Sequence, residues 1–141
     1  MLSLAQGRGM AMYGEMGFNS DGKIVGLDAK VVADAGAYPA IGGFLTVFTQ
    51  TMIQGVYDIP KIRYHARSAA TNTTHTAAYR GAGRPEATQL LERLIDVAAD
   101  ELQMDPAEIR LKNFISEDAF PITTLGLSLI HISEPTRPVP I

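Results

Sequence analysis

Hydrophobic residues alternate with polar or small residues along two stretches near the N-terminus. The two stretches flank the sequence NSDG at residues 19–22. All four of these residues favour turns, and Gly22 can adopt the positive φ that tight hairpin turns require. The pattern therefore predicts a β-hairpin over residues 10–34. Three methionines recur at strand spacing in the first stretch, which indicates packing rather than a soft-metal site: Met10, Met12 and Met16.

The second stretch contains Gly26 and Gly36, which predict a bulge or a close approach to another backbone. Residues 39–48 are rich in glycine and apolar side chains, and their pattern favours neither helix nor loop. A further strand is predicted from Lys61 to Ala70, because this run follows the break at Ile59-Pro60. The short polar side chains of residues 71–76 then predict a loop, which continues to residue 84.

Helical periodicity is clearest after this loop. Pro85 suits a first helical position, and apolar residues follow it at spacings of three, four and seven as far as Leu102. A second helix is predicted from Asp105-Pro106 to about Phe114, with Asp105 as its cap and Glu108 closing a capping box. The expected fold class is α+β, with a mixed or antiparallel sheet and helices packed on it.

Composition narrows the class of protein. With 141 residues, 46% of them hydrophobic, the chain can form one globular core. Twelve basic against fifteen acidic residues give no reason to expect nucleic acid as a partner. The absence of cysteine excludes disulfides, zinc thiolate sites, cysteine-ligated iron–sulfur clusters and a cysteine nucleophile. No secretory signal and no apolar run long enough to span a membrane is present, so a cytoplasmic protein is expected.

The last residues differ in character from the rest. Residues 127–137 read LSLIHISEPTR and lead into a proline-rich end. Back-translated, these eleven residues match a transposon-derived adapter used in sequencing libraries. We therefore expect residues 1–126 to be part of a domain, and residues 127–141 to be a non-native, disordered tail. The chain is then expected to be a piece of a longer protein, and Met1 need not be its start.

Candidate chemistry is concentrated in the sequence TNTTHTAAYRGAGRPEA at residues 71–87. A glycine-rich loop that leads into a helix presents backbone N–H groups and the positive end of the helix dipole, which favour an anionic ligand. Arg80 and Arg84 add fixed positive charge. Spacing alone also fits a simple tight turn. A dinucleotide fingerprint is excluded, because Gly81 and Gly83 lack the third glycine.

The sequence AYRGAGRPEA at residues 78–87 resembles the active-site loop of the xanthine dehydrogenase, aldehyde oxidase and aerobic carbon monoxide dehydrogenase family. It resembles the AYRGAGR form of the carbon-monoxide-dehydrogenase-like branch called form II. The resemblance extends over Gly7–Thr124, through the predicted hairpin, GVYDIPKIRYHARSAATNTT and the two predicted helices. It places the chain in the molybdopterin-binding domain of a molybdenum hydroxylase large subunit.

This resemblance implies a set of cofactors and partners. The expected cofactor is molybdenum-molybdopterin, in its cytosine dinucleotide form, with no protein side chain bound to the metal. Iron–sulfur clusters and FAD are expected on an iron–sulfur subunit and a flavin subunit of the same complex. The implied cofactor-binding residues are Arg80, Gly81, Ala82 and Gly83, supported by Tyr79 and Arg84.

The resemblance also implies hydroxylation of a small organic substrate by means of a glutamate base. That glutamate lies far downstream in the family, so no catalytic residue is expected in this chain. Glu86 suits a favourable charge in the first turn of a helix, and Glu92 suits a solvated helix face. The alternative is a structural or binding module that is inactive as an isolated chain. His75 is interpreted as a surface residue of the threonine loop and His65 as a residue on a sheet face.

Three departures from relatives bear on the substrate. Gly81 stands where form I enzymes have a copper-binding cysteine, so oxidation of carbon monoxide is not expected. Ala82 stands where purine and aldehyde oxidising members have a phenylalanine that stacks on aromatic substrates. The arginine of purine oxidisers falls near Phe48 here, so a xanthine-like purine is not expected either.

Overall fold

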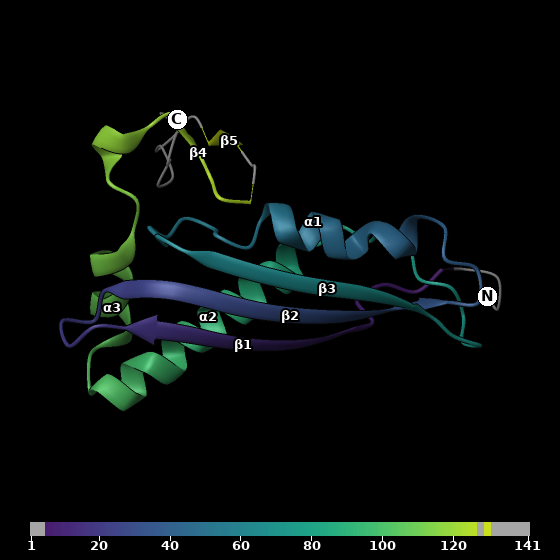
Figure 1. Ribbon diagram of the computed structural model, residues 1–141, viewed down its shortest axis with the longest axis horizontal. Helices are drawn as coiled ribbons and strands as arrows, with labels where there is room; N and C mark the ends of the chain where they lie inside the picture. Colours follow the sequence, from purple (N-terminus) through teal and green to yellow (C-terminus); the bar gives the residue numbers. More distant parts are fainter. Residues whose placement is uncertain (1–4, 127–128, 131–141) are drawn as a thin grey trace, which may run out of the picture.

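A three-stranded mixed sheet forms the centre of the computed structural model, which describes residues 5–126 and 129–130 (Figure 1). The strands are β1 (Met10–Phe18), β2 (Ile24–Gly36) and β3 (Ile62–Ala70), in the order β1-β2-β3. β1 and β2 pair antiparallel, whereas β2 and β3 pair parallel. The predicted hairpin, the third strand and the α+β class are therefore confirmed, and of the two sheet types expected the sheet is the mixed one.

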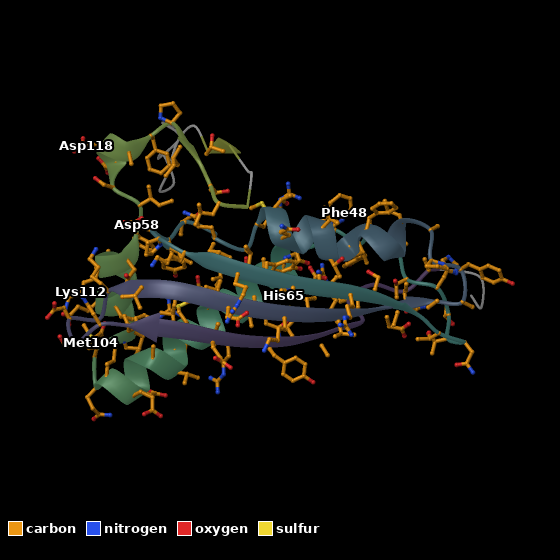
Figure 2. The ribbon with its side chains drawn as sticks, viewed as in Figure 1. Phe48, Asp58, His65, Met104, Lys112 and Asp118 are labelled. Carbon is orange, nitrogen blue, oxygen red and sulfur yellow. The ribbon has the colours of Figure 1, made fainter. Side chains whose placement is uncertain are left out.

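The two faces of the sheet have different environments. Side chains on one face of β2 are buried in the core, namely Leu27, Ala29, Val31, Ala33 and Ala35. Met12 and Met16 of β1 pack against this core, which confirms the interpretation of the methionines. The opposite face exposes Lys30 and His65, and His65 is labelled in Figure 2. Alternation therefore separates a packed face from a solvent-exposed face, as the strand period requires.

The segment between β2 and β3, for which the sequence favoured no element, is helical. A 3-10 helix (Ile41–Phe44) leads directly into α1 (Leu45–Thr51). Packing allows this path: a Cβ on Gly42 would lie 2.4 Å from the carbonyl oxygen of Thr76, so only glycine fits. Because β2 and β3 are parallel, this segment is their crossover connection. It contacts β2 and β3 on the packed side of the sheet.

Two longer helices follow β3. The helix α2 (Arg84–Leu102) crosses behind the sheet in Figure 1 and buries an apolar face against the core: Ala87, Leu90, Leu91, Ile95, Ala98 and Ala99. Asp105 caps α3 (Pro106–Asn113), because its Oδ1 accepts from the amides of Ala107 at 2.8 Å and Glu108 at 3.1 Å. The Glu108 carboxylate is paired with Lys112 at 3.1 Å rather than closing the expected capping box.

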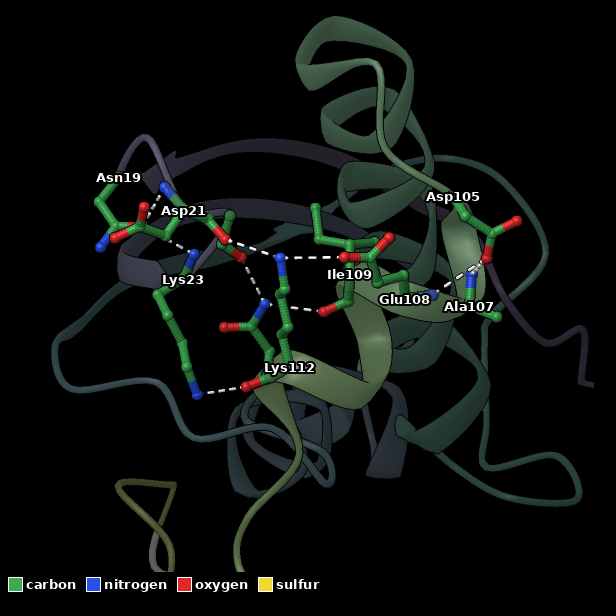
Figure 3. Close-up of polar contacts among 10 residues, drawn as sticks. Asn19, Asp21, Lys23, Asp105, Ala107, Glu108, Ile109 and Lys112 are labelled. Atoms are coloured by element: carbon green, nitrogen blue, oxygen red, sulfur yellow. Dashed lines mark hydrogen bonds and ion pairs between the residues drawn. The ribbon is translucent and has the colours of Figure 1, made fainter.

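The hairpin turn lies against the end of α3 (Figure 3). Asn19 organises the turn, since its Oδ1 accepts from the backbone amides of Asp21 at 3.1 Å and Lys23 at 2.9 Å. The Lys23 ammonium donates to the carbonyl of Lys112. Asn113, the last residue of α3, is buried and bonds to Gly22 in the turn and to Ile24, the first residue of β2. The turn predicted at residues 19–22 is therefore also the docking point of α3.

Glu92 corrects one sequence interpretation. It was expected on a solvated helix face, but its carboxylate accepts from the Tyr57 hydroxyl at 2.7 Å and from Arg110 Nε at 2.8 Å. Arg110 also donates to Asp96 at 2.7 Å, which ties α3 to α2. Burial, together with the bond to Glu92, raises the pKa of Tyr57 far above its ordinary value. The partners of Glu92 lie 18 and 35 residues away, so the helical period could not reveal them.

The chain ends in short elements. A 3-10 helix (Glu117–Ala119) precedes β4 (Ile122–Thr123), which pairs antiparallel with β5 (Leu129–Ile130). Apart from these two residues of β5, the predicted tail at 127–141 lies outside the described residues, so its disorder stays a prediction. Within the described part of the chain, no helix is both long and apolar enough to cross a bilayer.

Candidate molybdopterin-binding site

The loop at residues 79–83, here called the cofactor loop, has an unusual backbone. Gly81, Ala82 and Gly83 all have positive φ, at 95°, 26° and 89°. Two turns hold this path, since the amide of Ala82 donates to the carbonyl of Tyr79 at 2.7 Å and that of Arg84 to Gly81 at 3.1 Å. Positive φ is strained for alanine and readily adopted by glycine. The glycines at 81 and 83 are therefore required by the shape of the loop.

Donors without protein partners gather on this loop. The amides of Gly81 and Gly83 have no acceptor among the described residues, and neither does the exposed Arg80 guanidinium. Gly83 is also the N-cap of the 19-residue helix α2, and no described side chain caps this end. Amides and a guanidinium at the positive end of a helix dipole attract anionic oxygens. The loop therefore fits a ligand that presents negatively charged oxygen atoms.

The cofactor loop rests on α1. A Cβ on Gly83 would lie 2.5 Å from both the carbonyl carbon of Phe48 and the amide nitrogen of Thr49. No side chain fits between the two backbones at this point. Phe48, labelled in Figure 2, therefore lies beside the loop on α1, although the two segments are more than thirty residues apart in sequence.

A second support is Arg8, which precedes β1. Its Nη2 donates to the carbonyl of Arg80 at 2.6 Å, and its Nη1 donates to Glu86 Oε1 at 3.1 Å. The guanidinium carbon lies 5.1 Å from the centre of the Tyr79 ring, within cation–π range. Glu86 lies in the first turn of α2 as predicted, but its side chain is only 7% exposed and it is paired with Arg8.

Residues 71–76, here called the threonine segment, precede the loop and are held by Asp34 near the end of β2. Asp34 Oδ1 accepts from the Thr71 hydroxyl at 2.7 Å and the Gly36 amide at 2.8 Å, and Oδ2 accepts from the Thr73 hydroxyl at 2.9 Å. These bonds, that from Thr71 first, hold the pKa of the Asp34 carboxyl below its usual value of 3.8. At Gly36 the strand register shifts, and a Cβ would lie 2.3 Å from His75 Cα. The predicted bulge or close approach at Gly36 is therefore confirmed.

Comparison with known proteins decides the family of this chain. The model of the molybdopterin cofactor-binding domain matches residues 1–114. The chain belongs to the molybdopterin cofactor-binding domain family. The carbon monoxide dehydrogenase large chain of Hydrogenophaga pseudoflava is 44% identical over 118 residues, covering 80% of this chain and 15% of that protein. Aldehyde oxidoreductase of Megalodesulfovibrio gigas is 38% identical over 93 residues, covering 66% of this chain and 10% of that protein.

Solved structures agree with this assignment. Quinoline 2-oxidoreductase from Pseudomonas putida 86 superposes with a TM-score of 0.84 at 28% identity, covering 90% of this chain and 16% of that chain. A copper and molybdenum carbon monoxide dehydrogenase superposes with a TM-score of 0.73 at 34% identity, covering 86% and 16%. The family resemblance and the fold are thus confirmed. This molybdopterin-binding domain chain spans about 15% of the length of the first sequence relative.

The predicted site residues lie together in the structure, but two of the contacts that support them were not predicted. Arg80, Gly81, Ala82 and Gly83 form one continuous loop, and Arg84 folds back on it, with Nη1 3.4 Å from the Gly81 carbonyl oxygen. Arg8 and the Phe48–Thr49 backbone are supports that the sequence did not reveal, since nothing local marks a contact across 72 residues. His75 is half-buried rather than on the surface. Among residues 5–126, no three His, Cys, Asp or Glu side chains form a set that could hold a metal ion.

Replacing Asp34 by asparagine is expected to loosen the threonine segment in a pH-dependent way. Because the folded-state pKa is lowered, the stabilisation from the Asp34 carboxylate is present above pH 3.8 and is lost as the pH falls through the folded value. Asp34→Asn should therefore unfold at a lower temperature than wild type at pH 7, and the gap should close at acid pH. Thermal unfolding of both proteins across this range measures the effect.

Asp58→Asn is the matched control for this prediction. Asp58, labelled in Figure 2, is exposed, and its carboxylate accepts no hydrogen bond from a described residue. Its replacement should leave the unfolding temperature unchanged at pH 7. A gap between wild type and Asp34→Asn that stays constant from pH 7 to below pH 3.8 would contradict the assigned role of the carboxylate.

Proposed function

We propose that this chain is the cofactor-loop segment of a molybdenum hydroxylase large subunit, and that the cofactor loop binds the molybdenum end of molybdopterin. The observation that carries the proposal is the donor set: the amides of Gly81 and Gly83 and the exposed guanidinium of Arg80, none of which has an acceptor among the described residues. When bound, the cofactor supplies the oxidising centre at which a small organic substrate is hydroxylated. The chain supplies position and positive charge.

The roles of the individual residues follow from their chemistry. The Arg80 guanidinium would stabilise negative charge on oxygen atoms at the molybdenum end, and the two amides would fix their direction. The loop contains no cysteine, histidine, aspartate or glutamate, which suits a metal held by the cofactor alone. The cytosine dinucleotide form is proposed for the cofactor. An iron–sulfur subunit and a flavin subunit are proposed to remove the electrons, in keeping with relatives named as large chains or molybdenum-binding subunits.

For the substrate we propose a small organic molecule rather than carbon monoxide or a purine. Copper has no thiolate ligand at this loop, because Gly81 follows Arg80 and the sequence contains no cysteine. Ala82 has no aromatic ring to stack on a heterocycle. Phe48, whose backbone and Cβ lie next to Gly83, is an apolar residue. An apolar neighbour gives no charged hydrogen bonds to a polar purine.

We propose that the isolated chain contributes to cofactor binding but does not catalyse hydroxylation of a substrate. A general base needs an unengaged carboxylate beside the reacting atoms. Glu86 is paired with Arg8, and Glu92 is bonded to both Tyr57 and Arg110. In keeping with the family resemblance, which implies a glutamate base far downstream, we assign the base to a glutamate of a longer polypeptide, outside these 141 residues.

Molybdenum retention tests the proposal. The gene is expressed together with its flanking coding sequence, and molybdenum and pterin per polypeptide are measured in the purified wild type and in Arg80→Ala. Loss of a charge-assisted contact should reduce retention roughly tenfold or more. Arg67→Ala is the matched control, since Arg67 is an exposed arginine on β3, on the sheet face opposite α2.

The possible results distinguish cofactor binding by the protein from the specific role of Arg80. Molybdenum and pterin in the wild type and in Arg67→Ala, with depletion in Arg80→Ala, support both the function and the role of Arg80. Full retention in Arg80→Ala would remove that role and leave cofactor binding in place. A folded wild-type protein that never contains molybdenum or pterin would overturn the proposed function.

A further inference from the structure

Arg8 contacts the cofactor loop, although it lies 72 residues before Arg80 in the sequence. It lies in a short segment before β1 that is bonded on one side to residues 75–77, just before the cofactor loop, and on the other side to β2. Gln6 donates to the carbonyl of His75 at 3.1 Å and accepts from the amide of Ala77 at 2.8 Å, and the Gly9 carbonyl accepts from Asp34 at 2.7 Å. The backbone that carries Arg8 is therefore held against the approach to the cofactor loop.

The contact between Arg8 and the Arg80 carbonyl has a consequence for the neighbouring amide. The peptide unit between Arg80 and Gly81 is planar and trans, so its C=O and N–H groups point in opposite directions. Arg8 Nη2 holds the carbonyl at 2.6 Å. The N–H of Gly81, which has no acceptor among the described residues, therefore points away from Arg8.

The other contact of Arg8 fixes the loop to the helix. Glu86 Oε1 accepts from Arg8 Nη1, and Glu86 Oε2 is buried without a hydrogen bond from any described residue. Removal of Arg8 would leave both oxygens of this buried carboxylate without a hydrogen bond from a described residue, which would lower the free energy of unfolding. One planar guanidinium thus joins a loop carbonyl to the first turn of α2. A lysine ammonium at this position lacks the fork that holds both acceptors.

We propose that Arg8 is a positioning residue for the cofactor loop, which directs the Gly81 amide and fixes the loop to α2 through the Arg80 carbonyl and not through the Arg80 guanidinium. This inference rests on the proposed function for its biological meaning. The contacts of Arg8 with Arg80 and Glu86 involve only residues of this chain, so their effect on the loop can be tested without the cofactor.

Amide hydrogen exchange of the full 141-residue chain, resolved by NMR, is the test. The reporters are the two hydrogen-bonded loop amides, Ala82 and Arg84, compared with amides of β2. In Arg8→Ala, exchange of the loop amides should rise roughly tenfold relative to the β2 amides. Arg8→Lys should recover part of the loss, because it can hold one acceptor and not both. Arg63→Ala removes a comparable ion pair, with Asp28, and should leave the loop amides unchanged.

The comparison distinguishes positioning from general stabilisation. A purely structural role for Arg8 would raise exchange of the loop and of β2 by the same factor, and this result would overturn the proposal. Unchanged exchange at Ala82 and Arg84 would also overturn it. If Arg8→Ala does not fold, the same loop-to-β2 ratio in Arg8→Lys decides the question. Failure of the proposed function would appear separately, as absent molybdenum in the wild type, and would not alter the exchange ratio.

Discussion

Replacement of Gly83 by alanine is expected to destabilise the protein by about 3 kcal/mol or more. The new Cβ would lie 2.5 Å from two backbone atoms of α1, the carbonyl carbon of Phe48 and the amide nitrogen of Thr49. These atoms cannot rotate away as a flexible side chain could. The φ of 89° adds strain for any residue with a Cβ. Urea unfolding of wild type and Gly83→Ala gives the difference in the free energy of unfolding.

Gly43→Ala is the matched control for this prediction. Gly43 lies in the 3-10 helix that leads into the same helix α1, and a Cβ there would approach nothing nearer than the Pro39 Cβ at 3.9 Å. Its replacement should change stability by no more than about 0.5 kcal/mol. Equal unfolding midpoints for Gly83→Ala and Gly43→Ala would show that the loop and α1 do not touch as closely as described. On the proposed function, the protein with a displaced loop should also retain less molybdopterin cofactor, because the loop amides would lose their alignment.

The elements set by local pattern were predictable. The hairpin, β3, α2 and α3 each follow from alternation, helical spacing or a cap such as Asp105, all of which operate within a few residues. The crossover helix was not predictable, because residues 39–48 are rich in glycine and apolar residues and their pattern favours neither helix nor loop. Its path depends on a distant contact, that of Gly42 with the Thr76 carbonyl oxygen.

In the candidate site, too, the local residues were predictable and the tertiary contacts were not. Spacing alone left the loop open between an anion site and a tight turn, and the family resemblance supplied Arg80 and its neighbours. Neither source pointed to Arg8, because a contact between Arg8 and the Arg80 carbonyl joins segments 72 residues apart. Glu86 and Glu92 were placed on the helix correctly, but their partners are tertiary. Helical position therefore predicted where each carboxylate lies and not what it binds.

Asn113 is expected to be the most sensitive polar residue of the fold. It is 2% exposed; its Nδ2 donates to the carbonyls of Gly22 at 2.7 Å and Ile109 at 2.8 Å, and its Oδ1 accepts from the amide of Ile24 at 2.8 Å. In Asn113→Ala, the Ile24 amide and the Gly22 carbonyl lose their partner in the interior. Each unsatisfied group costs about 1–3 kcal/mol, so a loss of about 3–4 kcal/mol is expected. Thermal or urea unfolding measures it.

Two further variants show whether these hydrogen bonds are the cause. Asn72→Ala removes an asparagine that is exposed and whose side chain bonds to no described residue, and it should leave stability within about 0.5 kcal/mol of wild type. Asn113→Asp keeps an acceptor for the Ile24 amide but removes both donors and adds a buried charge, so it should be at least as destabilising as alanine. A stable Asn113→Asp would mean that the turn is held by the contact of Lys23 with the Lys112 carbonyl, and that α3 docks on the hairpin without its buried amide.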